Sequence, residues 1–271
     1  PPPANFYAQK ISNTIFWYVN AFYGPSGWGT GNVRNCPSQT VATQTYESSS
    51  PPPLDPPLSP TTIDAWIVEA KSNGYCSASY GCTGDNYSVT GAYPYFPREK
   101  THPAWVKGNF TLGNFPVAFR GYTYIEGDLN ITGGTSCNMS ISNVTGDVDS
   151  AESIAIIVKG KINISGACEI FGHSNGTGRN DHLVLVSKNT SASETVPSIL
   201  VNNTSQSDLF HSDGMIVLKS GAKALAIYGE GVVMENSASL VSFPEGRGVI
   251  RFKQAATGAG TYAPPSDWGE K

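Results

Sequence analysis

The histidines are the side chains of this sequence best suited to acid–base chemistry near neutral pH. The chain has four histidines, His102, His173, His182 and His211. His211 lies beside Asp208 and Asp213, and His173 and His182 bracket a loop with Arg179 and Asp181. Such groups could act as the acid and base of a polysaccharide lyase or hydrolase, which β-solenoids often host. A cleft that joins the residues around His211 would support an enzyme.

Other catalytic and metal-binding patterns are weak. Residues 172–176 match GxSxG, but a nucleophile elbow needs a helix directly afterwards, and residues 177–180 start a helix poorly. The cluster of Asp147, Asp149 and Glu152 lacks the regular spacing of a calcium loop and is typical of a solvated turn. The sequence therefore predicts no catalytic residue, no metal and no cofactor, and favours a protein that is not an enzyme.

Four of the five cysteines are suited to disulfides. Cys76 and Cys82 flank a short flexible loop, and Cys137 and Cys168 follow two similar strand patterns at similar places. Cys36 has no assigned partner. Because a four-cysteine zinc site needs two close pairs and only one is present, zinc is disfavoured. Disulfides indicate an oxidising compartment.

The chain is dense in Asn-x-Ser/Thr sequons, the acceptor pattern for N-linked glycans. They begin at Asn86, Asn109, Asn130, Asn138, Asn143, Asn163, Asn175, Asn189, Asn202 and Asn203. One interpretation is a glycoprotein, with Asn86, Asn175 and Asn189 on loops as the first candidates. The alternative is that strands reuse Asn-aliphatic-Ser/Thr for structural reasons.

A sequence pattern typical of a β-strand occurs twice in the chain and indicates how the chain is folded. Residues 125–133, IEGDLNITG, are matched 33 positions later by residues 158–166, VKGKINISG. In both, aliphatic residues alternate with polar ones around a central glycine, which is the period of a strand with one buried face. One such strand cannot bury its apolar face alone, so neighbouring repeats supply the core. The sequence predicts an all-β, right-handed β-solenoid.

The sequence predicts an aromatic helical segment over the N-terminal residues 1–23. Helical spacing and apolar character single out Tyr7, Ile11, Ile15, Trp17, Tyr18 and Phe22. A helix that is apolar nearly all round requires burial, either against its own domain or against another subunit. We therefore treat these side chains as candidate assembly contacts, with docking on the same chain as the alternative.

The rest of the chain divides into four parts. Residues 24–60 form a Gly- and Pro-rich linker, and residues 61–105 hold a short amphipathic helix followed by loops rich in Cys and Tyr. We expect this helix to cap the open end of the solenoid, which spans residues 106–252. Residues 253–271 form a C-terminal tail.

Composition limits the partners. Charged residues make up 14% of the chain and the net charge is −4, which argues against binding to nucleic acid. No run of eighteen apolar residues is present, so we expect no membrane span in this chain. The surplus of small polar residues is typical of extracellular proteins.

The layout resembles prepilin-like, pilus-associated extracellular β-helix proteins of uncultivated bacteria from candidate phyla. The matching parts are residues 60–74 with Trp66, the two repeats, and residues 229–268. The apolar pilin start and its processing site are missing from this sequence. The resemblance implies a surface appendage or adhesin and no reaction.

We therefore expect an extracellular or cell-surface structural protein. It would be a subunit of a pilus-like filament or of its adhesive head, and would bind copies of itself or other appendage subunits. The alternative is a carbohydrate-binding adhesin, which recognises surface glycans, or a β-helix enzyme acting on polysaccharides.

Overall fold

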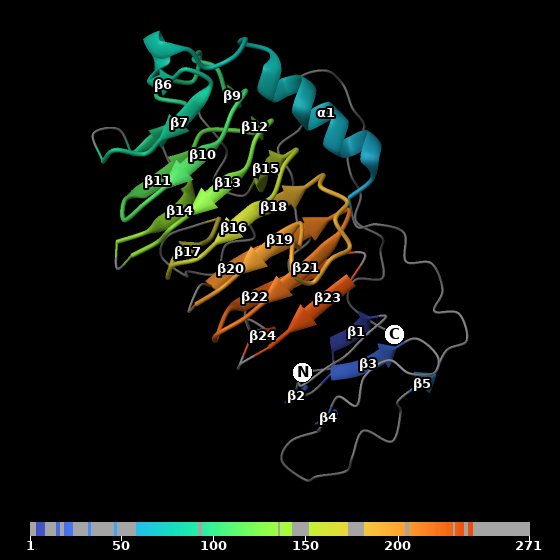
Figure 1. Ribbon diagram of the computed structural model, residues 1–271. Helices are drawn as coiled ribbons and strands as arrows, with labels where there is room; N and C mark the ends of the chain where they lie inside the picture. The colour runs from blue at the N-terminus through green and yellow to red at the C-terminus, as the bar shows by residue number, and fades with distance from the viewer. Residues whose placement is uncertain are drawn as a thin grey trace.

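The computed structural model shows a β-rich protein in which most strands pair in parallel (Figure 1). It describes residues 58–91, 94–134, 136–142, 152–172, 182–203, 206–229, 231–235 and 238–240, and five short strands before residue 58. Those five are β1 (Ala4–Ala8), β2 (Ile15–Phe16), β3 (Val19–Tyr23), β4 (Asn32–Val33) and β5 (Tyr46–Glu47).

The helix predicted within residues 1–23 is wrong, because β1, β2 and β3 lie there. Aromatic and β-branched residues favour strands, so their spacing over a short segment fits either structure. β1 pairs in parallel with β3. The side chains of the candidate assembly contacts in this segment lie outside the described part of the structure.

Two large sheets make up the body. The eight-stranded sheet contains β6 (Cys82–Thr83), β7 (Asn86–Ser88), β10 (Phe110–Leu112), β13 (Leu129–Ile131), β16 (Ile162–Ile164), β19 (Ile199–Val201), β21 (Met215–Leu218) and β23 (Gly231–Met234). The eleven-stranded sheet contains β8 (Tyr95–Phe96), β9 (Trp105–Val106), β11 (Pro116–Phe119), β12 (Thr123–Ile125), β14 (Asn138–Ile141), β15 (Ile154–Val158), β17 (Glu169–Ile170), β18 (Leu183–Ser187), β20 (Gln206–Ser212), β22 (Lys223–Tyr228) and β24 (Ser239–Leu240).

The chain visits these sheets in repeating rounds. A round is a run of consecutive strands, such as β10, β11 and β12, after which the chain returns to the first sheet beside its previous strand. The two similar sequence repeats are neighbours in this arrangement, because Leu129 is opposite Ile162 and Ile131 is opposite Ile164. The predicted stacking of these two repeats is therefore confirmed.

Buried and partly exposed side chains alternate along the strands, and the buried ones form the core between the sheets. In β10, β13 and β16 the first and third residues are buried, and the middle residue is half-buried. Aromatic rings fill the core near its first rounds, where Phe96 contacts Phe110 edge-on with 5.1 Å between ring centroids. Each round thus buries the apolar face of the next.

The single α-helix of the described residues, α1 (Pro60–Lys71), forms as the sequence predicts. The Ser59 side chain caps it by accepting the backbone N–H of Thr62, and Pro60 occupies the first turn. Gly74 follows with a φ of 79°, which suits glycine after a helix end. No helix in the described ranges is long and apolar enough to cross a membrane.

The expectation that α1 caps the end of the core is wrong. It lies along the flank of the eleven-stranded sheet, where it packs on β12 and β15 (Figure 1). Twelve residues of helix extend about 18 Å, enough to cross about four strands. The apolar stripe of α1 therefore runs along the stack of rounds. The end of the eight-stranded sheet where we expected the helix is formed instead by β6, which pairs antiparallel with β7.

β15 and β18 are apolar along most of their length because both faces of the sheet are buried in this region. Every residue of β15 and of β18 is buried. One set of alternating side chains faces the core between the sheets, and the other set faces α1. Burial raises the pKa of Tyr122, which precedes β12 and lies under the helix.

Candidate functional site

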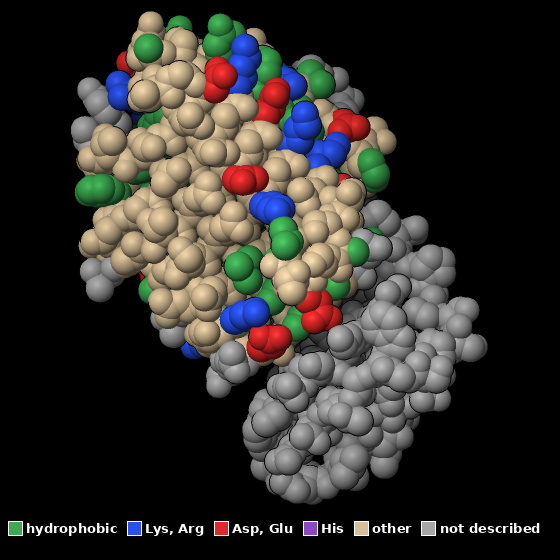
Figure 2. Space-filling model, in the orientation of Figure 1, with side chains coloured by type: hydrophobic (Ala, Val, Ile, Leu, Met, Phe, Trp, Pro, Cys, Tyr) green, Lys and Arg blue, Asp and Glu red, His purple; other side chains and the backbone are tan. Residues whose placement is uncertain are grey.

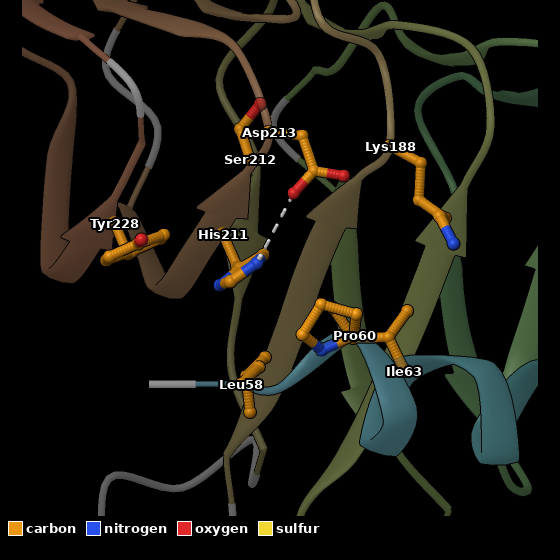
Figure 3. A pocket seen from close by; sticks show the side chains of 8 residues that line it. All are labelled: Leu58, Pro60, Ile63, Lys188, His211, Ser212, Asp213 and Tyr228. Carbon is orange, nitrogen blue, oxygen red and sulfur yellow. Dashed lines mark ion pairs between the residues drawn. The ribbon is translucent and has the colours of Figure 1, made fainter. Parts of the chain in front are cut away.

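A pocket of about 320 Å³ lies where the N-terminal end of α1 meets β20 and β22 (Figure 3). It is lined by Leu58, Pro60, Ile63, Lys188, His211, Ser212, Asp213 and Tyr228. The residues from the helix side are apolar, whereas the residues from the sheet side are polar or aromatic. The pocket therefore has one apolar wall and one wall that can form hydrogen bonds.

Strand register brings His211 into the pocket. Val186, His211 and Tyr228 are directly opposite one another on β18, β20 and β22. Because side chains alternate along a strand, His211 faces the helix side while Phe210 faces the core between the sheets. α1 begins at Pro60, and Pro60 and Ile63 of its first turn line the pocket beside His211.

His211 is buried and neutral at physiological pH. Its exposed fraction is 3%, and its ring stacks on Tyr228 with 4.9 Å between centroids. Burial lowers the pKa of His211 to about 4. Nδ1 has no hydrogen-bond partner among the described residues. Nε2 lies 3.9 Å from Oδ1 of Asp213, which is too long for a hydrogen bond.

Charged groups stand at the rim of the pocket. Lys188 Nζ lies 2.9 Å from Oδ1 of Asp64, which belongs to the first turns of α1. Desolvation raises the pKa of Asp213, and the positive charge of Lys188 opposes that rise. The rim therefore carries charges of both signs. Figure 2 shows that charged side chains on the visible face gather mainly along the flank that α1 occupies.

The arrangement can bind a ligand more readily than it can activate a nucleophile. The Ser212 hydroxyl is fully buried, contacts the Ser198 hydroxyl at 2.5 Å and accepts the N–H of Gly214. It is therefore committed to the fold. His211 is not hydrogen-bonded to Asp213, so the described residues contain no oriented acid–base pair here.

The sequence predicted part of this pocket. His211 and Asp213 line it as the cleft hypothesis requires, whereas the side chain of Asp208 lies outside the description. Lys188 and Tyr228 were missed, because their approach depends on strand register across 25 and 17 residues of sequence. The 33-residue repeat was the available signal, but the later rounds do not keep that spacing.

The other histidines do not join this pocket. His102 contacts Tyr80 and Glu99, and the backbone N–H of His182 donates to Ser153. His173, Arg179, Asp181 and residues 173–176 of the GxSxG match lie outside the described residues, as do Asp147 and Asp149. Within the described ranges, no group of three His, Cys, Asp or Glu is placed to hold a metal.

Both predicted disulfides are confirmed. Cys76 bonds to Cys82, and Cys137 bonds to Cys168 across a separation of 31 residues. The second disulfide joins neighbouring rounds, because Cys137 precedes β14 and Cys168 precedes its partner β17. Cys36 lies outside the described residues.

The strands account for much of the sequon density. In Asn130-Ile131-Thr132 and Asn163-Ile164-Ser165 the central aliphatic residue is buried in the core, so the two polar residues face outward. The Asn163 Nδ2 donates to Asn130 Oδ1 at 3.1 Å. Of the ten candidates, Asn86, Asn109, Asn202 and Asn203 are exposed, Asn130, Asn138, Asn163 and Asn189 are half-buried, and Asn143 and Asn175 are not described.

A ladder of polar side chains runs along one corner of the eight-stranded sheet. Asn86 Oδ1 accepts the backbone N–H of Asn109 at 2.8 Å, and Asn109 Oδ1 accepts that of Asp128 at 2.8 Å. Asp128 Oδ1 in turn accepts the N–H of Lys161 at 2.7 Å. Two of the sequon asparagines thus have a structural role at the turns between rounds.

Comparison of the chain with protein-family models, with curated proteins and with solved structures finds no match.

Proposed function

We propose that this chain is an extracellular structural protein, built as a β-solenoid, that serves as a subunit of a surface filament or of its adhesive head. The observation that carries the proposal is the parallel pairing of successive rounds, from β7 to β23 in one sheet. Every added round presents the same kind of strand edge to the next, so a stack of this type suits end-to-end growth.

The disulfides support a location outside the cytoplasm. Cys137–Cys168 ties two neighbouring rounds, and Cys76–Cys82 closes the loop after α1. Structural disulfides persist in oxidising compartments. We extend this to the cell surface because the chain has few charges and many small polar residues.

Deletion of residues 1–23 tests which part of the chain mediates assembly. We expect the full chain to sediment as assemblies and the deletion variant to sediment as a folded monomer. Assemblies of unchanged size in the deletion variant would place the contacts elsewhere. Loss of all folding on deletion would contradict an assembly role for these residues and favour docking on the same chain.

A second candidate function is glycan recognition by an adhesin, which the pocket around His211 favours. It combines an apolar wall with hydrogen-bonding groups, as small-molecule sites do. An enzyme acting on polysaccharides would release oligosaccharides, whereas an adhesin would bind glycans without turnover.

A further inference from the structure

We propose that the pocket between α1, β20 and β22 binds a neutral pyranose unit of a glycan. The inference deepens the adhesive role proposed above and rests on it for the source of the sugar. It starts from His211, which is only 3% exposed. Neither of its ring nitrogens has a hydrogen-bond partner among the described residues.

A buried imidazole without partners is costly, because its desolvation is not repaid. His211 lines a pocket of about 320 Å³, which is within the range of small-molecule sites, about 300–1,000 Å³. A ligand hydroxyl can donate to Nε2 or accept from it, as the tautomer requires, whereas Nδ1 is enclosed by the protein. A hydroxyl-bearing ligand would therefore supply a hydrogen-bond partner for Nε2, the ring nitrogen that lies toward Asp213.

The charged residues at the rim of the pocket disfavour an ionic ligand. Lys188 and Asp213 bring opposite charges to the rim, and Asp64 already pairs with Lys188 at 2.9 Å. An anionic ligand would meet the carboxylate of Asp213, and a cation would meet Lys188. An entirely apolar ligand would leave His211 and Asp213 unpaired. A neutral ligand with several hydroxyls avoids all three costs.

The two walls fit the two kinds of surface of a pyranose. Leu58, Pro60 and Ile63 form an apolar wall for the C–H groups of the ring. On the other wall Asp213 can accept from two hydroxyls, and Lys188 can donate to a third. Tyr228, stacked on His211 at 4.9 Å, holds the imidazole in position.

The test uses saturation-transfer difference NMR on the full chain. The probes are the methyl glycosides of glucose, galactose, mannose and N-acetylglucosamine at millimolar concentrations. We expect at least one glycoside to give a saturable signal. The affinity of the Asp213→Asn variant for that glycoside should be about tenfold lower or more, because the substitution weakens a charge-assisted hydrogen bond. Asp85→Asn, an exposed carboxylate outside the pocket lining, is the matched control and should bind as the unmodified chain does.

The proposal is overturned if no glycoside binds, or if Asp213→Asn and Asp85→Asn bind equally well. Binding of acetate or of methylammonium in preference to all four glycosides would also overturn it, because it would show an ion site. Thermal unfolding of both variants checks that each is folded. Assembly is measured separately by sedimentation, so a chain that forms filaments without binding sugar would refute this inference alone.

Discussion

Trp66 of α1 stacks on Tyr122, which directly precedes β12, with 4.9 Å between ring centroids and 15° between ring planes. This contact joins the helix to the residues at the start of β12, the strand on which α1 packs most closely. Trp66 is one of three buried side chains on α1, together with Ile63 and Ala70. The helix is thus held by the flank of the stack, and its first turn is positioned to form the pocket wall.

Replacement of Trp66 by alanine should destabilise the protein strongly. Removal of a buried tryptophan costs about 3–5 kcal/mol of unfolding free energy, from lost burial and from the cavity left behind. The matched control is Val68→Ala on the same helix, where the side chain is 54% exposed and the expected change is within about 0.5 kcal/mol. Urea unfolding measures both. Equal effects of the two substitutions would show that α1 is not held by this stack.

The two disulfides should contribute unequally to stability. Cys137–Cys168 closes a loop with a sequence separation of 31, and Cys76–Cys82 one with a separation of 6. Loop-closure entropy gives about 4 kcal/mol for the first and about 2 kcal/mol for the second. Paired Cys→Ser variants, compared by urea unfolding under identical conditions, measure the difference. A larger loss from the Cys76–Cys82 pair would contradict the role of Cys137–Cys168 as the link between rounds.

Gly160 allows two rounds to approach closely. A Cβ at this position would lie 2.5 Å from the carbonyl oxygen of Gly127 and would also clash with Oδ1 of Asp128. We expect Gly160→Ala to cost about 1–3 kcal/mol through strain in the polar ladder. Gly113→Ala is the control, since the nearest atom to its Cβ would be Thr132 Oγ1 at 3.9 Å. Thermal unfolding that ranks Gly113→Ala as the worse variant would argue against the observed packing.

Stability should fall in mild acid because of His211. Its pKa is lowered from 6.5 to about 4 in the folded protein, so the unfolded chain binds more protons between these values. Stability from the neutral, buried ring is therefore fully present above pH 6.5 and declines as the pH falls toward 4. The expected loss between pH 8 and pH 5 is about 2 kcal/mol.

The matched variant for this pH effect is His211→Gln, which has no titrating group. Urea unfolding at pH 8 and pH 5 should show a loss for the original chain that exceeds the loss for His211→Gln by about 2 kcal/mol. Carboxylates, including Asp213, titrate in both chains and cancel in this comparison. An equal pH dependence in the two chains would mean that His211 does not become charged on unfolding.

Local sequence signals predicted the features that depend on neighbouring residues. Ser59 and Pro60 at the start of α1 and Gly74 after its end are residue types that favour helix ends. The alternation in residues 125–133 marked a strand with one buried face. The exact 33-residue offset also predicted that these two repeats would pair, and with them the bond between Cys137 and Cys168. These signals depend on backbone conformation and on a period that is visible in the chain.

Features that depend on later register were missed or misread. The position of α1 on the flank follows from Trp66 meeting Tyr122, 56 residues away in the sequence, and nothing local distinguishes this from a cap. The pocket likewise requires Lys188, directly after β18, to meet His211 of β20 and Tyr228 of β22, and the spacing of these strands in the sequence is irregular. The N-terminal aromatic segment satisfied a helical period and still formed strands, because its residue types favour strands.

Electron microscopy of the purified native material, with intact mass on the same sample, tests the proposed role most directly. We expect regular filaments, or heads on filaments, built from this chain. A mass above 28.7 kDa would indicate glycans, which we expect at exposed sequons such as Asn202 rather than at the paired Asn130 and Asn163. Isolated particles at the bare mass of the chain, at every concentration tested, would contradict the role as a filament subunit.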